Sequence, residues 1–310
     1  RILFDMNNDR LDLRVSTYPT LYGEKSVLRL LNISDAMHDL DGLGFEKDIL
    51  NRFEDMLIGG EGIILVSGPT GSGKTTTLYS TLNKMDNPDV NIVTIEDPIE
   101  YDLDNINQAQ VNRRSGVTFA SALRAILRQD PDIIMVGEVR DEETVELAIR
   151  AALTGHLVFS TIHTNDSASG FTRLLNWGME PFLITSTVKG ILSQRLVRKL
   201  CKECREKHMV EPSDLIKFGL EVDEPIEFYK GVGCLSCRNT GYQGRVGLFE
   251  LIRMNNDIAD LVMEQKPGHV IRQKAIEYGM FSLLHDGLIK AQRGETSLQE
   301  IVETLGTDTI

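Results

Sequence analysis

Eight consecutive residues have the composition of a phosphate-binding loop. They are Gly68-Pro69-Thr70-Gly71-Ser72-Gly73-Lys74-Thr75, and Thr76 follows them. The pattern G-x-x-x-x-G-K-S/T binds the β- and γ-phosphates of a nucleotide when it connects a strand to a helix, because its backbone N–H groups turn inward at the positive end of that helix. Here the apolar run 63–66 precedes the motif and a helical segment follows it. We therefore expect Lys74 to place positive charge over the phosphates and Thr75 to coordinate Mg²⁺.

Carboxylates follow two further apolar runs, at the points where buried strands would end. Residues 91–95 lead into Glu96-Asp97-Pro98-Ile99-Glu100, and residues 132–136 lead into Gly137-Glu138. Open parallel sheets bind ligands at the carboxyl ends of their strands, so these acids are expected beside the phosphates. One acid of the first group would orient the attacking water, and Glu138 would reach Mg²⁺ directly or through water. A solvated acidic loop is the alternative interpretation of residues 96–100.

Two histidines bracket the fourth predicted strand, residues 157–162. His156 precedes it and His163 follows it. Because the carboxyl end of this strand should abut the nucleotide, we expect His163 to sense the phosphate or relay its presence, and we consider the same role for His156. A structural histidine is the alternative for both.

All four cysteines of the chain form two C-x-x-C pairs, Cys201 with Cys204 and Cys234 with Cys237. Four thiolates at this spacing are typical of a tetrahedral Zn²⁺ site, and four protein ligands leave no position open for catalysis. We therefore expect a structural zinc ion. Two disulfides are the alternative, which a reducing compartment disfavours.

The elements that must position these residues follow from the apolar pattern. Residues 1–33 alternate apolar and polar side chains, which predicts a fragment of an antiparallel sheet, and residues 45–58 have helical spacing. Buried-type strands then alternate with helices, which predicts a mostly parallel α/β sheet. The expected strands are 63–66, 92–95, 133–136 and 157–162. Residues 255–305 read as short helices broken at Pro267-Gly268, Gly279 and Gly294.

The composition is that of a globular chain of 310 residues with 41% apolar side chains, enough for one or two cores. Its net charge of -13 disfavours a direct nucleic-acid partner. No apolar run approaches the ~20 residues of a membrane-spanning helix and no signal peptide is apparent, so a cytosolic protein is expected. Because the chain begins at Arg1 within a strand-like segment, we also expect it to be part of a longer protein.

The motifs together resemble those of one family. The segments 68–75, 94–100, 127–141 and 154–164 are similar, in this order, to the Walker A, Asp, Walker B and His boxes of the secretion ATPase superfamily, and the resemblance extends from about residue 1 to about residue 300. Gly137 stands where many P-loop ATPases carry Asp, so the Walker B box is a variant with Glu138 alone. The four cysteines resemble the type II secretion and type IV pilus extension branch, whereas retraction motors resemble the remainder without them.

The resemblance implies an ATPase that binds ATP with Mg²⁺, and it assigns further roles. Glu100 would position or deprotonate the attacking water, with Glu96 as its rival. Arg14 and Arg29 match arginines that touch the γ-phosphate from the domain before the P-loop, where an always-protonated fork would neutralise charge. Exposed strand arginines are the alternative for both.

Three more arginines lie in or just before the segment 127–141. Arg124 and Arg128 are four residues apart and share one helix face. With Arg140, they are expected to serve subunit contacts or nucleotide sensing.

The family resemblance also implies how the chain is divided. Residues 1–34 would end a small α+β domain, 35–43 would be a linker, 44–196 a RecA-like P-loop ATPase domain, 197–250 a zinc-binding element and 251–310 a helical C-terminal region. Closure of the first domain on the nucleotide would pass movement around a homo-hexameric ring. The ring would be cytoplasmic, peripheral at the inner membrane, and would act on a platform protein and cytoplasmic assembly proteins of a secretion or pilus system.

Three other functions compete with this interpretation. They are a DNA-uptake or conjugation-type secretion ATPase, a RecA-like helicase, and a non-catalytic nucleotide-binding scaffold. The negative charge and the lack of a basic, aromatic-rich stretch argue against direct work on nucleic acid, and the full set of acids argues against a scaffold.

Overall fold

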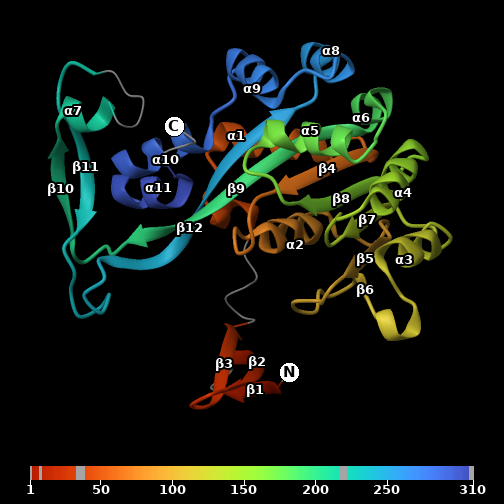
Figure 1. The fold of residues 1–310 in the computed structure, drawn as a ribbon, viewed down its shortest axis with the longest axis horizontal. Coiled ribbons are helices and arrows are strands. Elements are labelled where there is room, and N and C mark those ends of the chain that lie inside the picture. Colours follow the sequence, from red (N-terminus) through yellow and green to blue (C-terminus); the bar gives the residue numbers. More distant parts are fainter. Residues whose placement is uncertain (1, 7–8, 33–38, 217–221, 307–310) are drawn as a thin grey trace.

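The computed structural model describes residues 2–6, 9–32, 39–216 and 222–306. Within them lie a seven-stranded sheet, a three-stranded N-terminal sheet and a two-stranded ribbon. In Figure 1 the large sheet crosses the body of the molecule, the ribbon β10–β11 extends from one side, and the N-terminal sheet lies below the body.

The central sheet has the strand order β12-β9-β4-β8-β7-β5-β6. Its inner strands are β4 (Gly62–Ser67), β8 (Leu157–Ile162), β7 (Ile133–Val136) and β5 (Ile92–Glu96), all parallel. They confirm the four predicted strands to within one residue at each end. The short strand β6 (Asn107–Gln110), which was not predicted, adds a parallel edge.

Helices cover both faces of this sheet, as the side-chain alternation along β4 requires. Ile63 and Leu65 belong to one apolar core, and Ile64 and Val66 to the other. The first core contains residues of α3 (Phe119–Ile126), α4 (Glu142–Leu153), α5 (Ser167–Asn176), α6 (Pro181–Thr187), α8 (Asn256–Met263) and α9 (Gly268–Glu277). The second contains residues of α1 (Lys47–Leu57) and α2 (Lys74–Met85), next to the turn η1 (Leu40–Leu43).

The sheet continues beyond the expected end of the ATPase domain. The expected boundary at 196/197 falls inside β9 (Val188–Leu200), which pairs parallel with β4. Strand β12 (Tyr242–Arg253), expected to begin in the zinc element, is antiparallel to β9, so the sheet is mixed. Helices α8 and α9 likewise pack in the same core as α5. Residues 201–241 separate the two paired strands, and no local pattern reveals a pairing across that interval.

The ribbon and the last two helices form a smaller core of their own. Strand β10 (Arg205–Val210) pairs antiparallel with β11 (Ile226–Gly231), and the one-turn helix α7 (Pro212–Leu215) follows β10. Val210 and Phe228 of the ribbon pack with residues of α10 (Leu283–Gln292) and α11 (Leu298–Leu305). The predicted breaks at Pro267-Gly268, Gly279 and Gly294 are confirmed, since each lies at or between helix ends.

A buried ion pair fixes α10 to the central sheet. The Lys290 ammonium lies 2.6 Å from the Asp286 carboxylate, and both side chains are inaccessible to solvent. The same Asp286 oxygen accepts the Phe249 N–H of β12 at 2.8 Å, and Lys290 donates to the Gly247 carbonyl at 2.8 Å. Removing one partner of such a pair typically costs about 3–5 kcal/mol, because the other charge is left buried and unpaired, so both residues are needed where α10 meets β12.

The N-terminal sheet confirms the antiparallel fragment. Strands β1 (Ile2–Met6), β2 (Asp9–Thr20) and β3 (Gly23–Asn32) pair in sequence order, and Arg14 of β2 lies directly across from Arg29 of β3. Only strands of the expected α+β domain fall within residues 2–6 and 9–32. Of the helices in the described residues, none has both the length and the apolar character that crossing a bilayer requires.

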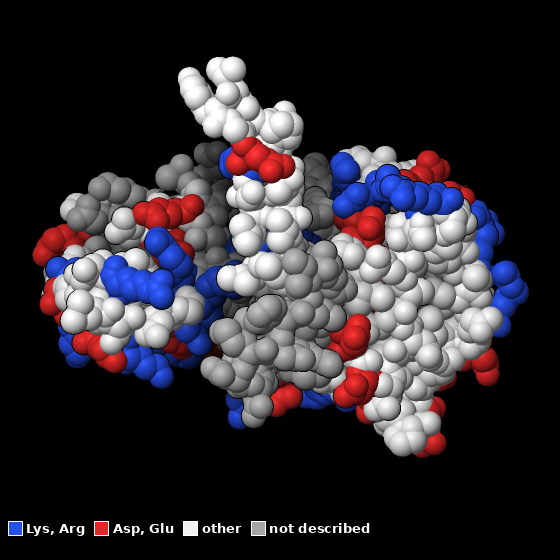
Figure 2. Space-filling view, turned by 90° about the horizontal axis from the view of Figure 1, so that it is seen from below, with Lys and Arg blue, Asp and Glu red and all other residues white. Residues whose placement is uncertain are grey.

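Seen from below, the molecule exposes both signs of charge. Figure 2 shows Lys and Arg side chains along one upper edge, with Asp and Glu side chains beside them and elsewhere on the same face. This face therefore offers no uniformly basic surface.

Candidate active site

The phosphate-binding loop lies between β4 and α2, as its sequence predicts. Gly68, Gly71 and Gly73 have φ of 146°, 81° and 90°, values that favour glycine. At Gly68 a β-carbon would also come within 2.5 Å of the Gln194 carbonyl oxygen. Both the backbone conformation and the close approach of β9 therefore require glycine at this position.

Lys74 begins α2 and folds its ammonium group back over the loop. Nζ donates to the carbonyl oxygens of Gly68 at 2.7 Å and Pro69 at 2.9 Å. Burial lowers the pKa of Lys74 to about 8, although the nearby Glu138 carboxylate opposes this shift. Within the described residues the buried Ser72 hydroxyl has no hydrogen-bond partner. A buried hydroxyl that can still form a hydrogen bond and an ammonium group bound to loop carbonyls fit a loop that accepts phosphate oxygens.

Strand β9 holds this loop in place from the side. The Gln194 amide donates to the Ser72 carbonyl at 2.7 Å and accepts from the Thr77 hydroxyl at 2.9 Å. The Ser67 hydroxyl donates to that of Ser193 at 3.1 Å. Sequence reasoning did not find these β9 residues, because β9 reaches the loop only through its pairing with β4.

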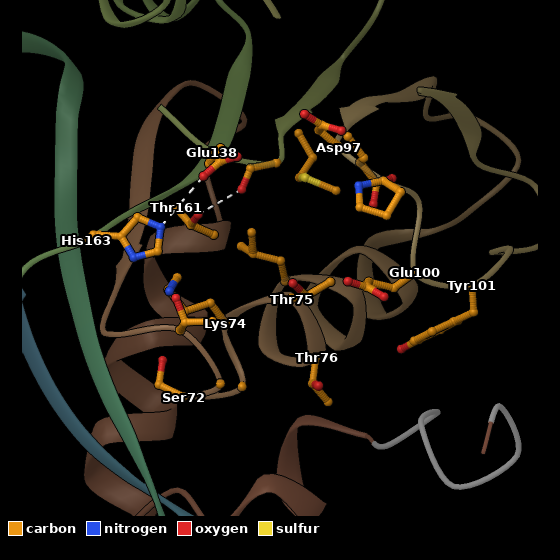
Figure 3. A pocket seen from close by; sticks show the side chains of 18 of the residues that line it. Ser72, Lys74, Thr75, Thr76, Asp97, Glu100, Tyr101, Glu138, Thr161 and His163 are labelled. Atoms are coloured by element: carbon orange, nitrogen blue, oxygen red, sulfur yellow. Dashed lines mark hydrogen bonds and ion pairs between the residues drawn. The ribbon is translucent and has the colours of Figure 1, made fainter. Parts of the chain in front are cut away.

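A pocket of about 560 Å³ opens beside the loop. Figure 3 shows Lys74 at the left with Glu138 and His163 above it, Thr75 near the centre, and Glu100 with Tyr101 at the right. The predicted residues that line it come from the P-loop, the two acidic segments, the end of β8 and β3. They are Thr70, Gly71, Ser72, Gly73, Lys74, Thr75, Thr76, Glu96, Glu100, Glu138, His163 and Arg29.

Glu138 follows β7 and points into this pocket. Its side chain is 12% exposed, and its carboxylate lies 2.6 Å from Arg140 Nη2 and 3.6 Å from His163 Nε2. The residue before it, Gly137, packs so tightly that a β-carbon would lie 3.3 Å from both Glu96 Cα and the Ile95 carbonyl oxygen. Glycine at this position therefore lets β7 and β5 bring their acids close together.

The two rival carboxylates of the Asp box have different surroundings. Glu96 is buried and accepts hydrogen bonds from the Tyr79 phenol, from the Thr94 hydroxyl at 2.6 Å and from the Gln108 amide at 3.1 Å. Burial, together with the Glu96 charge, raises the pKa of Tyr79. Glu100 is half-buried at the pocket wall, and its backbone N–H donates to the Tyr79 phenol oxygen at 3.3 Å.

The two histidines lie at opposite ends of β8. His163 is at the carboxyl end, and its side chain is 46% exposed in the pocket. His156 is at the amino end, where Nδ1 lies 2.8 Å from the Ala151 carbonyl oxygen at the end of α4. That position does not fit the relay role considered for His156.

The arginines also fall into two groups, those that line the pocket and those that lie outside it. Arg29 and Arg140 line the pocket, and so does Arg245 of β12, which sequence reasoning missed. Arg124 pairs with Glu143, and Arg128 donates to the Arg124 carbonyl at 2.8 Å; neither lines the pocket. The backbone of Arg14 is described as part of β2, but its side chain lies outside the described residues.

The four cysteines come together between β9 and β12. Their sulfur atoms all lie within 4.8 Å of one another, and the closest pairs are 3.7 to 3.8 Å apart. A tetrahedral Zn²⁺ site with bonds of about 2.3 Å places its sulfur ligands about 3.8 Å apart, so the arrangement fits zinc. In the described structure all four thiols are free, unlike the alternative of two disulfides. Cys237 also accepts the Cys234 and Gly241 N–H groups, which would stabilise a thiolate.

The P-loop between β4 and α2, with acids after the neighbouring strands, defines a nucleotide-binding P-loop protein of the α/β class. Comparison with known proteins gives a narrower result. The chain belongs to the family described as type II/IV secretion system protein, whose model matches residues 1–303. The resemblance inferred from the four boxes is thereby confirmed.

Individual relatives and solved structures agree with this membership. The chain is 48% identical over 294 residues to the type IV pilus assembly ATPase PilB of Thermus thermophilus, covering 94% of this chain and 33% of that protein. It is 47% identical over 305 residues to the type II secretion system protein E of Xanthomonas campestris, covering 97% and 54%. The chain thus spans about a third to a half of these relatives. The pilus retraction motor PilT with bound ADP superimposes with a TM-score of 0.69 at 29% identity, covering 97% of this chain and 76% of that chain.

Proposed function

We propose that this chain hydrolyses ATP and is the motor part of a type II secretion or type IV pilus assembly machine. The observation that carries the proposal is the pocket in which the P-loop, Glu100, Glu138 and His163 meet Arg29 from the N-terminal sheet. The names of the relatives at 47–48% identity support both the reaction and the two kinds of machine.

Each side chain receives a role from its surroundings. The loop 68–75 with Thr76 binds the phosphates, and Lys74 moves from the loop carbonyls to them. Thr75 and Glu138 are the residues that would hold Mg²⁺, which when bound neutralises charge on the phosphoryl oxygens. His163, 3.6 Å from Glu138, reports the state of that carboxylate to the loop that follows β8.

Glu100 is the better candidate for the group that positions or deprotonates the attacking water. Three donors already occupy the buried Glu96 carboxylate, so few of its lone pairs remain to bind the attacking water. Glu96 instead holds the Asp-box segment through Tyr79, which in turn contacts the Glu100 backbone.

Arg29 would neutralise the γ-phosphate when the N-terminal domain closes, and Arg14, directly across from it, would assist. We retain residues 1–34 as this moving domain and 35–43 as its linker. The ATPase domain begins at 44, and we extend it to include β9 and β12, because both belong to its sheet. The four cysteines, as a structural Zn²⁺ site, stabilise the insert between those strands, and α10 and α11 support it.

Domain closure does useful work when one subunit moves its neighbour. We therefore propose a cytoplasmic homo-hexamer at the inner membrane, acting on a platform protein and on cytoplasmic assembly proteins.

The reaction is tested by comparing two lysines of the same helix. Lys74→Ala should lower ATP turnover at least a hundredfold with an unchanged circular dichroism spectrum, because it removes the charge over the phosphates. Lys84→Ala is the matched control, since Lys84 lies in the last turn of α2 and pairs with Glu54 at the surface. Glu100→Gln should bind ATP and hydrolyse it slowly. Turnover by Lys74→Ala within tenfold of the unmodified protein would refute the proposal.

A further inference from the structure

The chain that follows His163 is held at every residue before α5 begins. The Thr164 hydroxyl donates to that of Ser67, the last residue of β4, at 3.0 Å. Arg195 of β9 donates to the Asn165 carbonyl at 2.9 Å, and Asp166 caps α5 through the Ser169 N–H at 2.7 Å. The first residue of α5 is therefore one of the fixed points, together with Ser67 and Arg195, that set the geometry of the short segment after His163.

That first residue, Ser167, is held by Glu250 of β12. The Ser167 N–H donates to Glu250 Oε1 at 2.9 Å, and the Ser167 hydroxyl donates to the Glu250 carbonyl at 2.8 Å. Ser167 and Glu250 are 0% and 1% exposed. A carboxylate at the first N–H of a helix satisfies a donor that has no partner within the helix and interacts favourably with the helix dipole.

The second oxygen of the same carboxylate faces the C-terminal helices. Glu250 Oε2 accepts the Leu283 N–H, at the start of α10, at 3.4 Å and lies 3.9 Å from Arg272 Nε of α9. Within the described residues, that Arg272 nitrogen is buried and has no hydrogen-bond partner. One oxygen is thus well bound and the other has only long contacts, although a buried guanidinium donor lies nearby.

These contacts make Glu250 the point where α5, α9 and α10 meet. Burial raises the pKa of Glu250, whereas the Ser167 N–H and the Arg272 charge lower it. A shift of α9 by about 1 Å would bring Arg272 to the roughly 2.9 Å of a charge-assisted hydrogen bond with Oε2. Such a contact draws charge away from the oxygen that holds Ser167.

We propose that Glu250 is a positioning residue that sets the place of His163 in the pocket according to the position of α9 and α10. This inference rests on the proposed ATPase function, and it connects the pocket to the part of the molecule that contacts the zinc insert. Helix α10 lies between them, since Asp286 binds the β12 backbone beside Glu250 and Ala291 packs with Phe228 of β11. The route from the insert to Ser167 therefore runs through contiguous, buried contacts, and the partly exposed residues 163–166 complete it.

A double-mutant cycle in the full chain separates positioning from general stability. Glu250→Gln should lower kcat at least tenfold and change KM for ATP less than twofold. Added to His163→Ala, it should cause less than a twofold further loss, because its effect passes through His163. Glu300→Gln is the matched control: Glu300 is also buried and binds Arg198, but it lies on α11, away from Ser167. Its effect should be small in both backgrounds.

Hydrogen exchange gives a readout that does not depend on turnover. Protection of the amides of residues 164–169 should fall at least tenfold in Glu250→Gln and remain unchanged in Glu300→Gln. If Glu250→Gln does not fold, Ser167→Ala takes its place in both experiments. It removes only the hydrogen bond from the Ser167 hydroxyl to the Glu250 carbonyl oxygen. An equal loss of kcat with and without His163, or unchanged protection, overturns the inference. Absence of turnover in the unmodified protein, with the exchange result as expected, would instead contradict the proposed function alone.

Discussion

Lys74 must be charged to bind phosphate, but it lies in a site from which water is largely excluded. Such a site disfavours the charged form. Burial has lowered its pKa to about 8, and the loop carbonyls of Gly68 and Pro69 hold the ammonium group until a ligand arrives. An anionic ligand favours the charged form, so binding of ATP should be accompanied by proton uptake at pH values above 8.

The affinity for ATP should therefore depend on pH in a defined direction. Below pH 8 Lys74 is protonated before binding and the affinity is constant. Above pH 8 the free protein loses this proton, and the affinity should fall by up to about tenfold per pH unit. Calorimetric titration between pH 7 and 9.5 measures the effect, and Lys74→Ala, which lacks the group, should not show this fall. A constant affinity across the range would show that burial does not lower this pKa.

Among individual residues, the sequence predicts those within motifs better than those that contact the motifs from distant strands. Lys74, Glu100 and Glu138 follow strands that are recognisable by their own apolar runs, so they could be placed at one edge of the sheet in advance. Gln194 and Arg245 belong to strands that reach the pocket by pairing with distant segments. Nothing local to either residue indicates that contact.

Among the elements, the cysteine cluster is the one whose stability depends most clearly on an ion. The three buried cysteines form an apolar cluster separate from both cores of the central sheet, with Cys234 packed against it. A closed thiolate site contributes its binding free energy to folding, so loss of the metal should loosen residues 201–241 and leave the sheet intact.

We therefore expect elemental analysis of the purified protein to find about one zinc ion per chain, and Cys201→Ser to abolish it. Hydrogen exchange should then show lost protection in β10 and β11, with β4, β8 and β7 unchanged. Ser236→Ala, in the same C-x-x-C segment but without a thiol, should retain the metal. Metal-free unmodified protein would exclude the site.

Elements were predictable where their own pattern carried the information. Strands such as β4 and β8 are mainly apolar runs, and α9 follows Pro267, while Gly279 and Gly294 lie between α9, α10 and α11. The division of the chain at 196/197 was less successful, because the exposed Arg198 and Lys199 interrupt the apolar run of β9 before the strand ends at the buried Leu200. Their membership in the sheet depends on pairing across residues 201–241.

At the scale of the whole molecule, Arg29 is the residue that crosses between parts. It belongs to the N-terminal sheet and yet lines the pocket beside the P-loop. A cation supplied from a separate domain makes hydrolysis depend on the position of that domain, which is a requirement for a motor.

Arg29→Ala should therefore lower ATP turnover at least tenfold with little loss of nucleotide affinity. Lys25→Ala, which removes a cation from the same exposed strand, is the matched control and should have no effect. Turnover per chain should also rise with protein concentration, and light scattering should detect hexamers favoured by ATP analogues. Full turnover by a strictly monomeric species would contradict the proposed coupling between subunits.

The pairing of β9 with β12 has one more consequence. Leu200 and Tyr242 are register partners, and the Cys201 N–H donates to the Gly241 carbonyl at 2.9 Å. The chain thus leaves the sheet after Leu200 and rejoins it at Tyr242, directly across from it, so residues 201–241 form a loop whose two ends are adjacent. Because the two ends are already adjacent, a short turn could replace residues 201–241 without changing the register of either strand. The apolar residues of α10 and α11 that pack against the insert would then need new apolar contacts. The insert is an exchangeable module, which evolution or protein engineering can add or remove while the nucleotide pocket stays in place.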